Sequence, residues 1–291
     1  REELVFLPDA EHGYYRGTRF DWSGIIEHVD YRGHRFYAPL HTEHDPCRHD
    51  SVSGPADEFA MFNPMGFAEA EPGEPFVKIG VGLLDKGRSD EYLFDGDYRL
   101  RRPGTWRIEQ GGHWISFEQV LVGESGWAYS YRKTIRLMAG EPGFVMEYLL
   151  ENSGTRTVDI THYNHNFTLI DGLPYGPDYL VEFPFSTGEP ISIDELAWFR
   201  DGAIEVERPL EGRSLWNPLY EGPGRSDYNA ATVRNQITGA SISFDGDAPV
   251  QRMVFWAVER AACPEPFFRI KLDPDEGTTW STSYRFGVDS A

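Results

Sequence analysis

A short polar cluster just past the middle of the chain carries the residue types best suited to chemistry. Two histidines and two asparagines fall within positions 162–166. Titratable and amide groups need solvent or a partner, because burying one without a hydrogen bond costs about 1–3 kcal/mol. A ligand pocket would supply such partners, so His165 is a candidate for proton transfer near neutral pH. The alternative interpretation is a hydrogen-bonded histidine at a strand end.

The segment before the cluster determines which of its side chains share a face. Residues 143–161 are predicted to form two strands joined by a turn, with the cluster at the end of the second. Successive side chains of a regular strand alternate between its two faces. Tyr163 and His165 are therefore expected on one face, and His162, Asn164 and Asn166 on the other.

Several charged residues elsewhere are candidates for binding sugar hydroxyls or a substrate carboxylate. Arg16 and Arg19 lie close to aromatic residues, and guanidinium groups beside aromatic rings suit a carbohydrate or an anionic sugar. The further candidates are Asp57, Glu58, Lys78 and Asp227. Taken singly, each is also explained as an ordinary surface or salt-bridged residue.

A histidine-rich loop raises the question of a metal site. It carries His41, His44, Cys47 and His49, with acidic residues between them. Their spacing matches no familiar zinc pattern, and a polar loop explains them equally well, so we assign no metal. The sequence has no glycine-rich phosphate loop and no Gly-x-Ser-x-Gly elbow, so nucleotide-dependent and serine-hydrolase functions have no support.

Short segments with alternating apolar residues run through the chain and predict an all-β fold. The clearest are 106–109, 114–120, 129–137, 143–152, 179–183, 240–244, 251–258 and 279–286. We also expect a hairpin formed by 25–29 and 34–37, one strand at 76–84, and a single short helix at 193–199. No linker or repeat divides the chain, so residues 1–291 are predicted to form one domain.

Composition argues against several classes of partner. Asp and Glu number 47 against 27 Lys and Arg, and no basic patch stands out. Nucleic acid and anionic membranes select for clustered positive charge, so neither is expected as a partner. No apolar run approaches the roughly 18 residues that a membrane span needs. We expect a soluble protein, either cytoplasmic or exported after loss of a signal segment; the two cysteines do not decide between these.

Two segments resemble the galactose mutarotase-like (aldose 1-epimerase) superfamily. Asn164-His165-Asn166-Phe167-Thr168-Leu169 is similar to the segment "T-N-H-x-Y-F-N-L", which delivers that family's acid histidine. Cys263-Pro264-Glu265-Pro266 is similar to its "C-L-E-P" segment, and a "P-G-E-T"-like turn at 274–279 and a closing "Y-R-F" at 284–286 follow. The order and rough spacing of the segments agree, and the likeness extends weakly across the strand pattern of most of the chain.

The sequence also departs from the family's pattern. Pro264 stands where the family usually has an aliphatic residue. Arg19 lies at about the place of the family's "N-R-I" segment, and His113 or the loop 41–49 at that of its "L-H-G-G" segment. The resemblance therefore implies a divergent member of the superfamily.

The resemblance implies an antiparallel β-supersandwich and mutarotation of a mono- or oligosaccharide without a cofactor. Mutarotation needs a base for the anomeric hydroxyl proton and an acid for the ring oxygen, and the implied pair is Glu265 as base and His165 as acid. The two should face each other across one pocket, about a sugar ring apart. Asn164 and His113 join the candidate substrate-binding residues.

Two other functions on the same scaffold remain open, because a fold does not select a reaction. A polysaccharide lyase or related sugar-modifying enzyme would place positive charge, from Arg16, Arg19 or Lys78, on a uronate. A non-catalytic sugar-binding protein would use the aromatic residues alone. The identity of the sugar and the oligomeric state are not predicted.

Overall fold

The computed structural model describes residues 5–289, which form two large antiparallel sheets and three small ones. The eleven-stranded sheet contains, in spatial order, β15 (Ile191–Ile193), β16 (Ala197–Arg200), β17 (Ala203–Val206), β14 (Tyr179–Glu182), β19 (Ala230–Asn235), β20 (Ala240–Gly246), β23 (Gly277–Val288), β12 (Gly143–Asn152), β11 (Ala128–Leu137), β10 (Trp114–Val122) and β9 (Thr105–Gln110). The five-stranded sheet contains β18 (Leu215–Arg225), β21 (Val250–Val258), β22 (Ala261–Leu272), β13 (Val158–Phe167) and β5 (Gly54–Phe59).

The smaller sheets come from the first third of the chain. They pair β1 (Val5–Phe6) with β2 (Ile25–Ile26), β3 (Val29–Tyr31) with β4 (His34–Phe36), and β7 (Gly82–Asp85) with both β6 (Pro75–Lys78) and β8 (Arg99–Pro103). The 3₁₀ turn η1 (Ser226–Tyr228) is the one helical element among the described residues. Within residues 5–289, no helix has the length and apolar character to cross a membrane.

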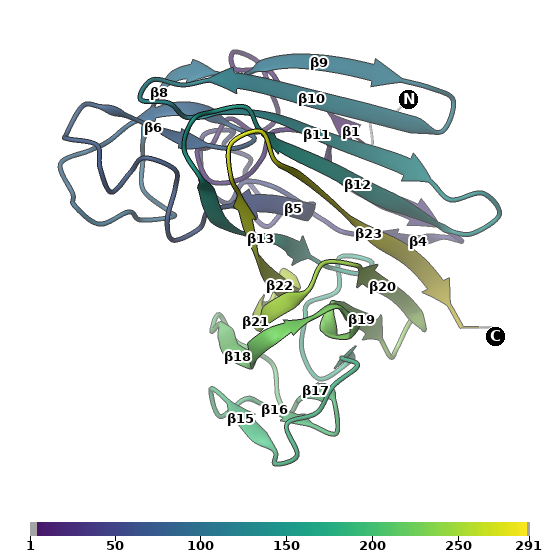
Figure 1. Cartoon of the computed structure of the whole chain (residues 1–291). Helices are drawn as coiled ribbons and strands as arrows, with labels where there is room; N and C mark the ends of the chain where they lie inside the picture. The colour runs from purple at the N-terminus through teal and green to yellow at the C-terminus, as the bar shows by residue number, and fades with distance from the viewer. Residues whose placement is uncertain (1–4, 290–291) are drawn as a thin grey trace.

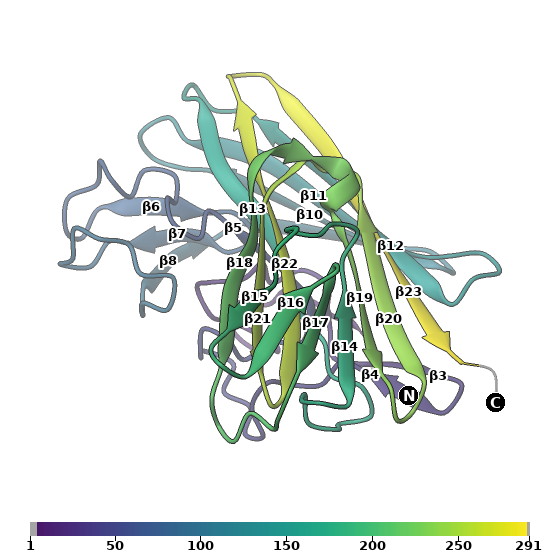
Figure 2. The same cartoon turned by 90° about the horizontal axis from the view of Figure 1, so that it is seen from below.

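The two large sheets pack face to face. Strands β9–β12 and β23 form the upper layer in Figure 1, with β5 and β13 below them. In Figure 2, β15–β17 of the larger sheet lie in front of β21 and β22, and β10 and β11 lie behind them. The core between the layers is aromatic: Trp280 of β23 lies 6.3 Å from Phe59 of β5 and 5.6 Å from Phe268 of β22, ring centre to ring centre. Burial of such large apolar groups is the main source of stability in a sandwich.

Strand β13 is buried on both faces, which is unusual for a strand so rich in polar residues. Every residue from His162 to Phe167 is buried. One face of the strand meets the larger sheet. The other face is covered by segments from the first third of the chain, since Phe20, Leu40 and Val52 share a buried cluster with Phe167 and Cys263. The polar cluster therefore forms the second half of β13, and the strand extends beyond Thr161, where the sequence predicts its end.

Two predicted elements are wrong. Residues 193–199 form no helix; they contain the end of β15, the turn 194–196 and the start of β16, with Asp194 and Glu195 in the left-handed region at φ 50° and 57°. Segment 76–84 is likewise a hairpin of β6 and β7. Gly80 turns it with φ 81°, and a Cβ there would lie 2.6 Å from the Cβ of Asp21, so only glycine fits. The hairpin expected from 25–29 and 34–37 forms only in part, as β3 paired with β4, while Ile25 and Ile26 pair with β1.

Candidate active site

The alternation predicted for β13 is confirmed. The Tyr163 and His165 rings lie on the outer face of the five-stranded sheet, 6.0 Å apart. His162 lies on the inner face, with its ring 5.2 Å from that of Trp280. One strand therefore contributes to two separate polar clusters.

His165 and Glu265 are cross-strand neighbours in the five-stranded sheet. The β13–β22 ladder pairs His162 with Phe268, and an isolated bridge pairs Thr168 with Ala262, so the same register places position 165 opposite position 265. Nε2 of His165 lies 3.1 Å from Oε1 of Glu265. The two groups thus lie side by side, and not across the width of a sugar ring as expected.

The prolines around Glu265 explain why the ladder opens beside this pair. Regular pairing of β13 with β22 stops at His162–Phe268. Pro264 and Pro266 have no N–H to donate, so β22 lacks two ladder donors here. The side chain of Asn166 fills part of the gap by donating from Nδ2 to the carbonyl oxygen of Pro264, at 2.8 Å.

The pair is enclosed by apolar rings. His165 is 4% exposed and Glu265 5% exposed. The imidazole stacks on Phe167 with ring centres 3.9 Å apart, and Phe20 and Trp256 approach it edge-on at 5.7 and 5.3 Å. These rings exclude water, which would otherwise stabilise the charged forms of His165 and Glu265.

Burial therefore favours neutral forms of both groups. It raises the pKa of Glu265 to about 8, with the nearby Glu58 carboxylate adding to the rise and Arg19 opposing it. Burial also lowers the pKa of His165 well below its usual value, and the positive charge of Arg19 adds to this effect. At neutral pH the favoured state is a carboxylic acid beside a neutral imidazole, so the pair holds one transferable proton.

A pocket of about 390 Å³ opens over the pair. It is lined by Arg19, Leu40, His49, Asp50, Met61, Phe94, His165, Phe167, Ser214, Trp216, Trp256 and Glu265. Trp216 is 50% exposed at its rim. The volume falls in the range of small-molecule sites, and flat aromatic faces beside a few polar groups are typical of them.

Glu58 and Lys78 lie beneath this pocket with Arg19. Oε2 of Glu58 accepts hydrogen bonds from Nε of Arg19 at 2.8 Å and from the Tyr163 hydroxyl at 2.6 Å, and Oε1 accepts one from Nζ of Lys78 at 3.1 Å. Burial opposes ionisation of Glu58, but Arg19 and Lys78 outweigh it and hold its pKa below its usual value. Of these residues, Arg19 reaches the pocket wall.

Asp57 and Asn164 lie on the inner face, away from the pocket. Asp57 follows the alternation of β5 and is opposite Asn164 of β13. Its carboxylate is 2.7 Å from Nζ of Lys133 and 3.0 Å from Nε2 of His162, and it accepts hydrogen bonds from Asn164 and Tyr148. This cluster is sealed between the two sheets, since Asp57 is 0% exposed.

The three other predicted binding residues lie outside the pocket. Arg16 donates to the carbonyl oxygen of Glu11 and lines a neighbouring pocket that shares His49 with this one. His113 lies in the turn between β9 and β10. Asp227 lies in η1, exposed and paired with Arg225.

Several lining residues are not among the predicted ones. Trp256 belongs to an alternating strand, where a pocket wall and an ordinary core position give the same pattern. Trp216 lies in β18, which does not alternate and is not among the predicted strands. Asp50 follows the histidine loop and pairs with Nε2 of His41 at 2.8 Å. His49 lines the pocket. Among residues 5–289, no three His, Cys, Asp or Glu side chains are grouped to hold a metal ion.

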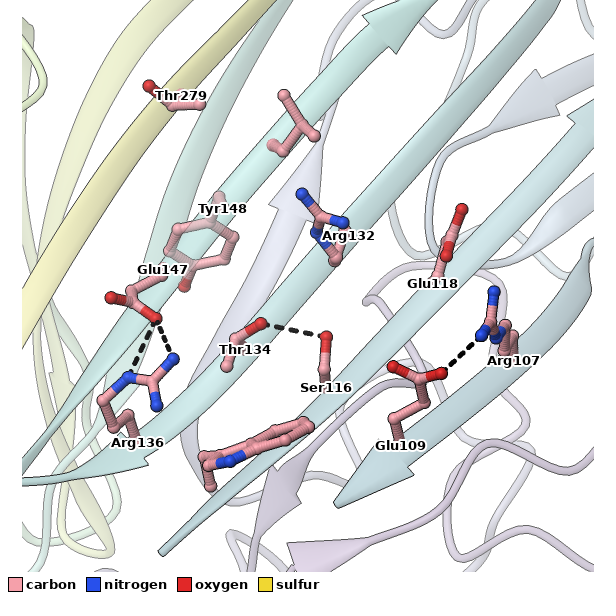
Figure 3. Close-up of a pocket in the computed structure, with 12 residues that line it drawn as sticks. Arg107, Glu109, Ser116, Glu118, Arg132, Thr134, Arg136, Glu147, Tyr148 and Thr279 are labelled. Atoms are coloured by element: carbon pink, nitrogen blue, oxygen red, sulfur yellow. Dashed lines mark hydrogen bonds and ion pairs between the residues drawn. The ribbon is translucent and has the colours of Figure 1, made fainter. Parts of the chain in front are cut away.

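A larger depression, of about 640 Å³, lies on the outer face of the eleven-stranded sheet (Figure 3). Its charges form pairs, such as Arg107 with Glu109 and Arg136 with Glu147. These side chains are close to half exposed or more, and solvated pairs of this kind contribute little. The buried, water-excluded pair on β13 and β22 is the better place for chemistry.

The architecture is shared with known structures. A protein from Synechocystis sp. PCC 6803 is 14% identical, with a TM-score of 0.60 over 99% of this chain and 97% of that one. A galactose mutarotase-like protein from Lactobacillus casei is 11% identical, with a TM-score of 0.56 over 98% and 100%. A galactose mutarotase related enzyme from Lactobacillus acidophilus is 10% identical, with a TM-score of 0.54 over 94% and 96%.

No protein-family model and no curated protein matches the sequence. At these identities the structural likeness speaks for the fold alone. It confirms the fold that the resemblance implied, and it covers nearly the whole chain. The chain has the galactose mutarotase-like fold, an antiparallel β-supersandwich.

Proposed function

We propose that this protein is an aldose 1-epimerase-type enzyme that interconverts sugar anomers by acid/base catalysis at Glu265 and His165, without a cofactor. The observation that carries the proposal is the contact between the two side chains, 3.1 Å apart in a buried pocket. A hydrogen-bonded structural histidine would account for the contact alone, but not for the pocket that both side chains line. The fold, which mutarotase-related proteins share, can host this reaction but does not select it.

The side-by-side arrangement suits the two oxygens of a hemiacetal. The anomeric hydroxyl and the ring oxygen are bonded to the same carbon, so the groups that serve them must lie close together, each within about 3 Å of its oxygen. A neutral imidazole and a carboxylic acid supply the required base and acid at once. Burial therefore favours His165 as base and Glu265 as acid, the reverse of the roles that the family resemblance implied.

The proposed reaction is balanced in protons. His165 takes the anomeric hydroxyl proton while Glu265 gives its proton to the ring oxygen, and the ring carbon–oxygen bond breaks to leave an open-chain aldehyde. The aldehyde group rotates, and the ring hydroxyl attacks its other face. Glu265 takes that hydroxyl's proton back and His165 returns a proton to the new anomeric oxygen. The pair ends as it began.

The first prediction concerns loss of this pair. In Glu265→Gln and His165→Asn, the rate of anomer exchange of a competent sugar, measured by NMR over a panel of aldoses, should fall by about 100-fold or more, the usual contribution of a positioned acid or base. Glu124→Gln and His12→Asn are matched controls, because both side chains are exposed. They should leave the exchange rate unchanged.

The same experiment separates the alternatives. Exchange that persists at the wild-type rate in Glu265→Gln and His165→Asn would refute the proposal. Sugar binding without any exchange would indicate a non-catalytic binding protein. Formation of an unsaturated, ultraviolet-absorbing product from a polyuronate would indicate a lyase.

A further inference from the structure

Arg19 is a buried cation at the wall of the candidate pocket. It is 6% exposed, and its guanidinium carbon lies 4.4 Å from the ring centres of both Phe20 and Phe94. Its Nε and Nη2 are used by Glu58 and the Tyr163 hydroxyl. Nη1 has no hydrogen-bond partner among residues 5–289. Since Arg19 lines the pocket, this donor is available to a ligand there.

The charges beneath the pocket do not cancel. The single carboxylate of Glu58 serves two cationic side chains, Arg19 and Lys78, and all three residues are buried. A buried charge without a partner is costly, so a site with one surplus positive charge favours a ligand that brings a negative one. Glu265 adds no compensating charge at neutral pH, because burial keeps it protonated.

Asp50 and Arg252, two other charged groups near the pocket, have partners of their own. Asp50, also in the pocket lining, pairs with His41 at 2.8 Å and lies 3.9 Å from His49. Arg252, whose charge reaches Glu265, pairs with Glu221 at 2.9 Å. Among these groups the positive charge therefore lies on Arg19 and Lys78; because burial lowers the pKa of Lys78, Arg19 is the permanent cation of the two and the one that lines the pocket.

We propose that the substrate is an aldose with one carboxylate, a uronic acid, whose carboxylate accepts a hydrogen bond from Nη1 of Arg19. The inference rests on the proposed epimerase function and names its substrate class. A monoanion matches the single surplus charge, and the planar guanidinium is suited to carboxylate oxygens. The ring would then lie between Arg19 and the Glu265–His165 pair, with the tryptophans of the pocket beside it.

The test compares sugars that share one ring configuration and differ in the group at C6 and its charge. Anomer exchange is measured by NMR for D-galacturonate, its methyl ester, D-galactose and D-galactose 6-phosphate, and binding of each is followed by tryptophan fluorescence. The protein should show a kcat/KM for the uronate at least about tenfold above those for the ester and the hexose, as loss of one charged hydrogen bond implies. Because this comparison uses the unaltered protein, it does not depend on any variant folding.

A variant then locates the preference. Arg19→Gln should bring the ratio of kcat/KM for the uronate to that for the hexose close to one. Arg269→Gln removes the same charge at an exposed position and should leave this ratio unchanged. Equal rates for uronate, ester and hexose would overturn the inference and leave the epimerase proposal standing, and so would a preference for the phosphate. If no sugar exchanges, the epimerase proposal fails, and a uronate preference in binding alone would still support the role of Arg19.

Discussion

Burial controls the protonation of Glu265 more strongly than its charged neighbours do. Arg19 and Arg252 both favour the carboxylate, yet the pKa is raised to about 8. Folding thus shifts a carboxyl from mostly charged in the unfolded chain to mostly neutral at pH 7. A shift in this direction costs stability once the unfolded carboxyl ionises, because the folded protein must keep a proton that the unfolded one releases.

The pH dependence of stability should report this shift. The folded pKa of Glu265 is raised, so between about pH 4.5 and about pH 8 the folded state binds more protons than the unfolded state, and the free energy of unfolding falls as pH rises, by at most about 1.4 kcal/mol per pH unit. Glu265→Gln cannot titrate and should lose this slope. Denaturant unfolding at pH 5, 6, 7 and 8 would measure it, and parallel curves for the two proteins would contradict the buried, neutral carboxyl.

The sequence indicated part of the site. His165, Glu265 and Arg19 have residue types and neighbours that are informative on their own or through a family pattern. Trp256 does not, because an aromatic residue in an alternating strand has the same pattern whether it packs in a core or faces a ligand. Trp216 lies in a strand that two prolines and two register shifts make irregular, so no period marks it. Which residues of two distant strands become neighbours depends on sheet register, which one sequence does not specify.

At the level of elements, β11 carries one end of the buried ion cluster between the sheets. Nζ of Lys133 lies 2.7 Å from Asp57, 3.5 Å from Asp21 and 2.6 Å from the carbonyl oxygen of Ser23. Asp57 is held by β5, next to Glu58 of the pocket. The cluster therefore connects the larger sheet to the strand that carries the floor of the candidate site.

Removing the cation of this cluster should lower the stability of the protein. Lys133→Met leaves two buried carboxylates without their cation and should lower the free energy of unfolding by about 3–5 kcal/mol. Arg136→Met is a matched control on the same strand; its partner Glu147 is 47% exposed, and the pair should contribute about 1 kcal/mol or less. Urea unfolding measures both. If both variants lost the same free energy of unfolding, the buried cluster would contribute no more to stability than the exposed pair.

Two elements show why local patterns fail. Residues 193–199 have a helix-like composition, but seven residues are too few to be stable as a helix alone, and strand pairing with β17 decides their structure. In segment 76–84, alternation continues through a turn, because Gly80 reverses the chain without interrupting the run of apolar residues. Tertiary contacts override the local signal in both.

At the scale of the molecule, the two faces of the five-stranded sheet have different roles. Its inner face builds the core with the larger sheet, and its outer face, covered by loops from the first third of the chain, forms the pocket. The alternation of β13 places His162 in one compartment and His165 in the other. The all-β fold could be predicted from the many period-two segments. The division of the strands between two sheets could not, because a strand has the same alternating sequence pattern in either sheet.

The most direct test of the central claim is a double-variant comparison of anomer exchange. If Glu265 and His165 share one proton and act as a unit, then Glu265→Gln and His165→Asn should each reduce the exchange rate by about 100-fold or more, and the double variant should be no slower than the slower single variant. Losses that multiply in the double variant would show that the two groups act independently. A rate unchanged in either single variant would show that the pair is not the catalytic device.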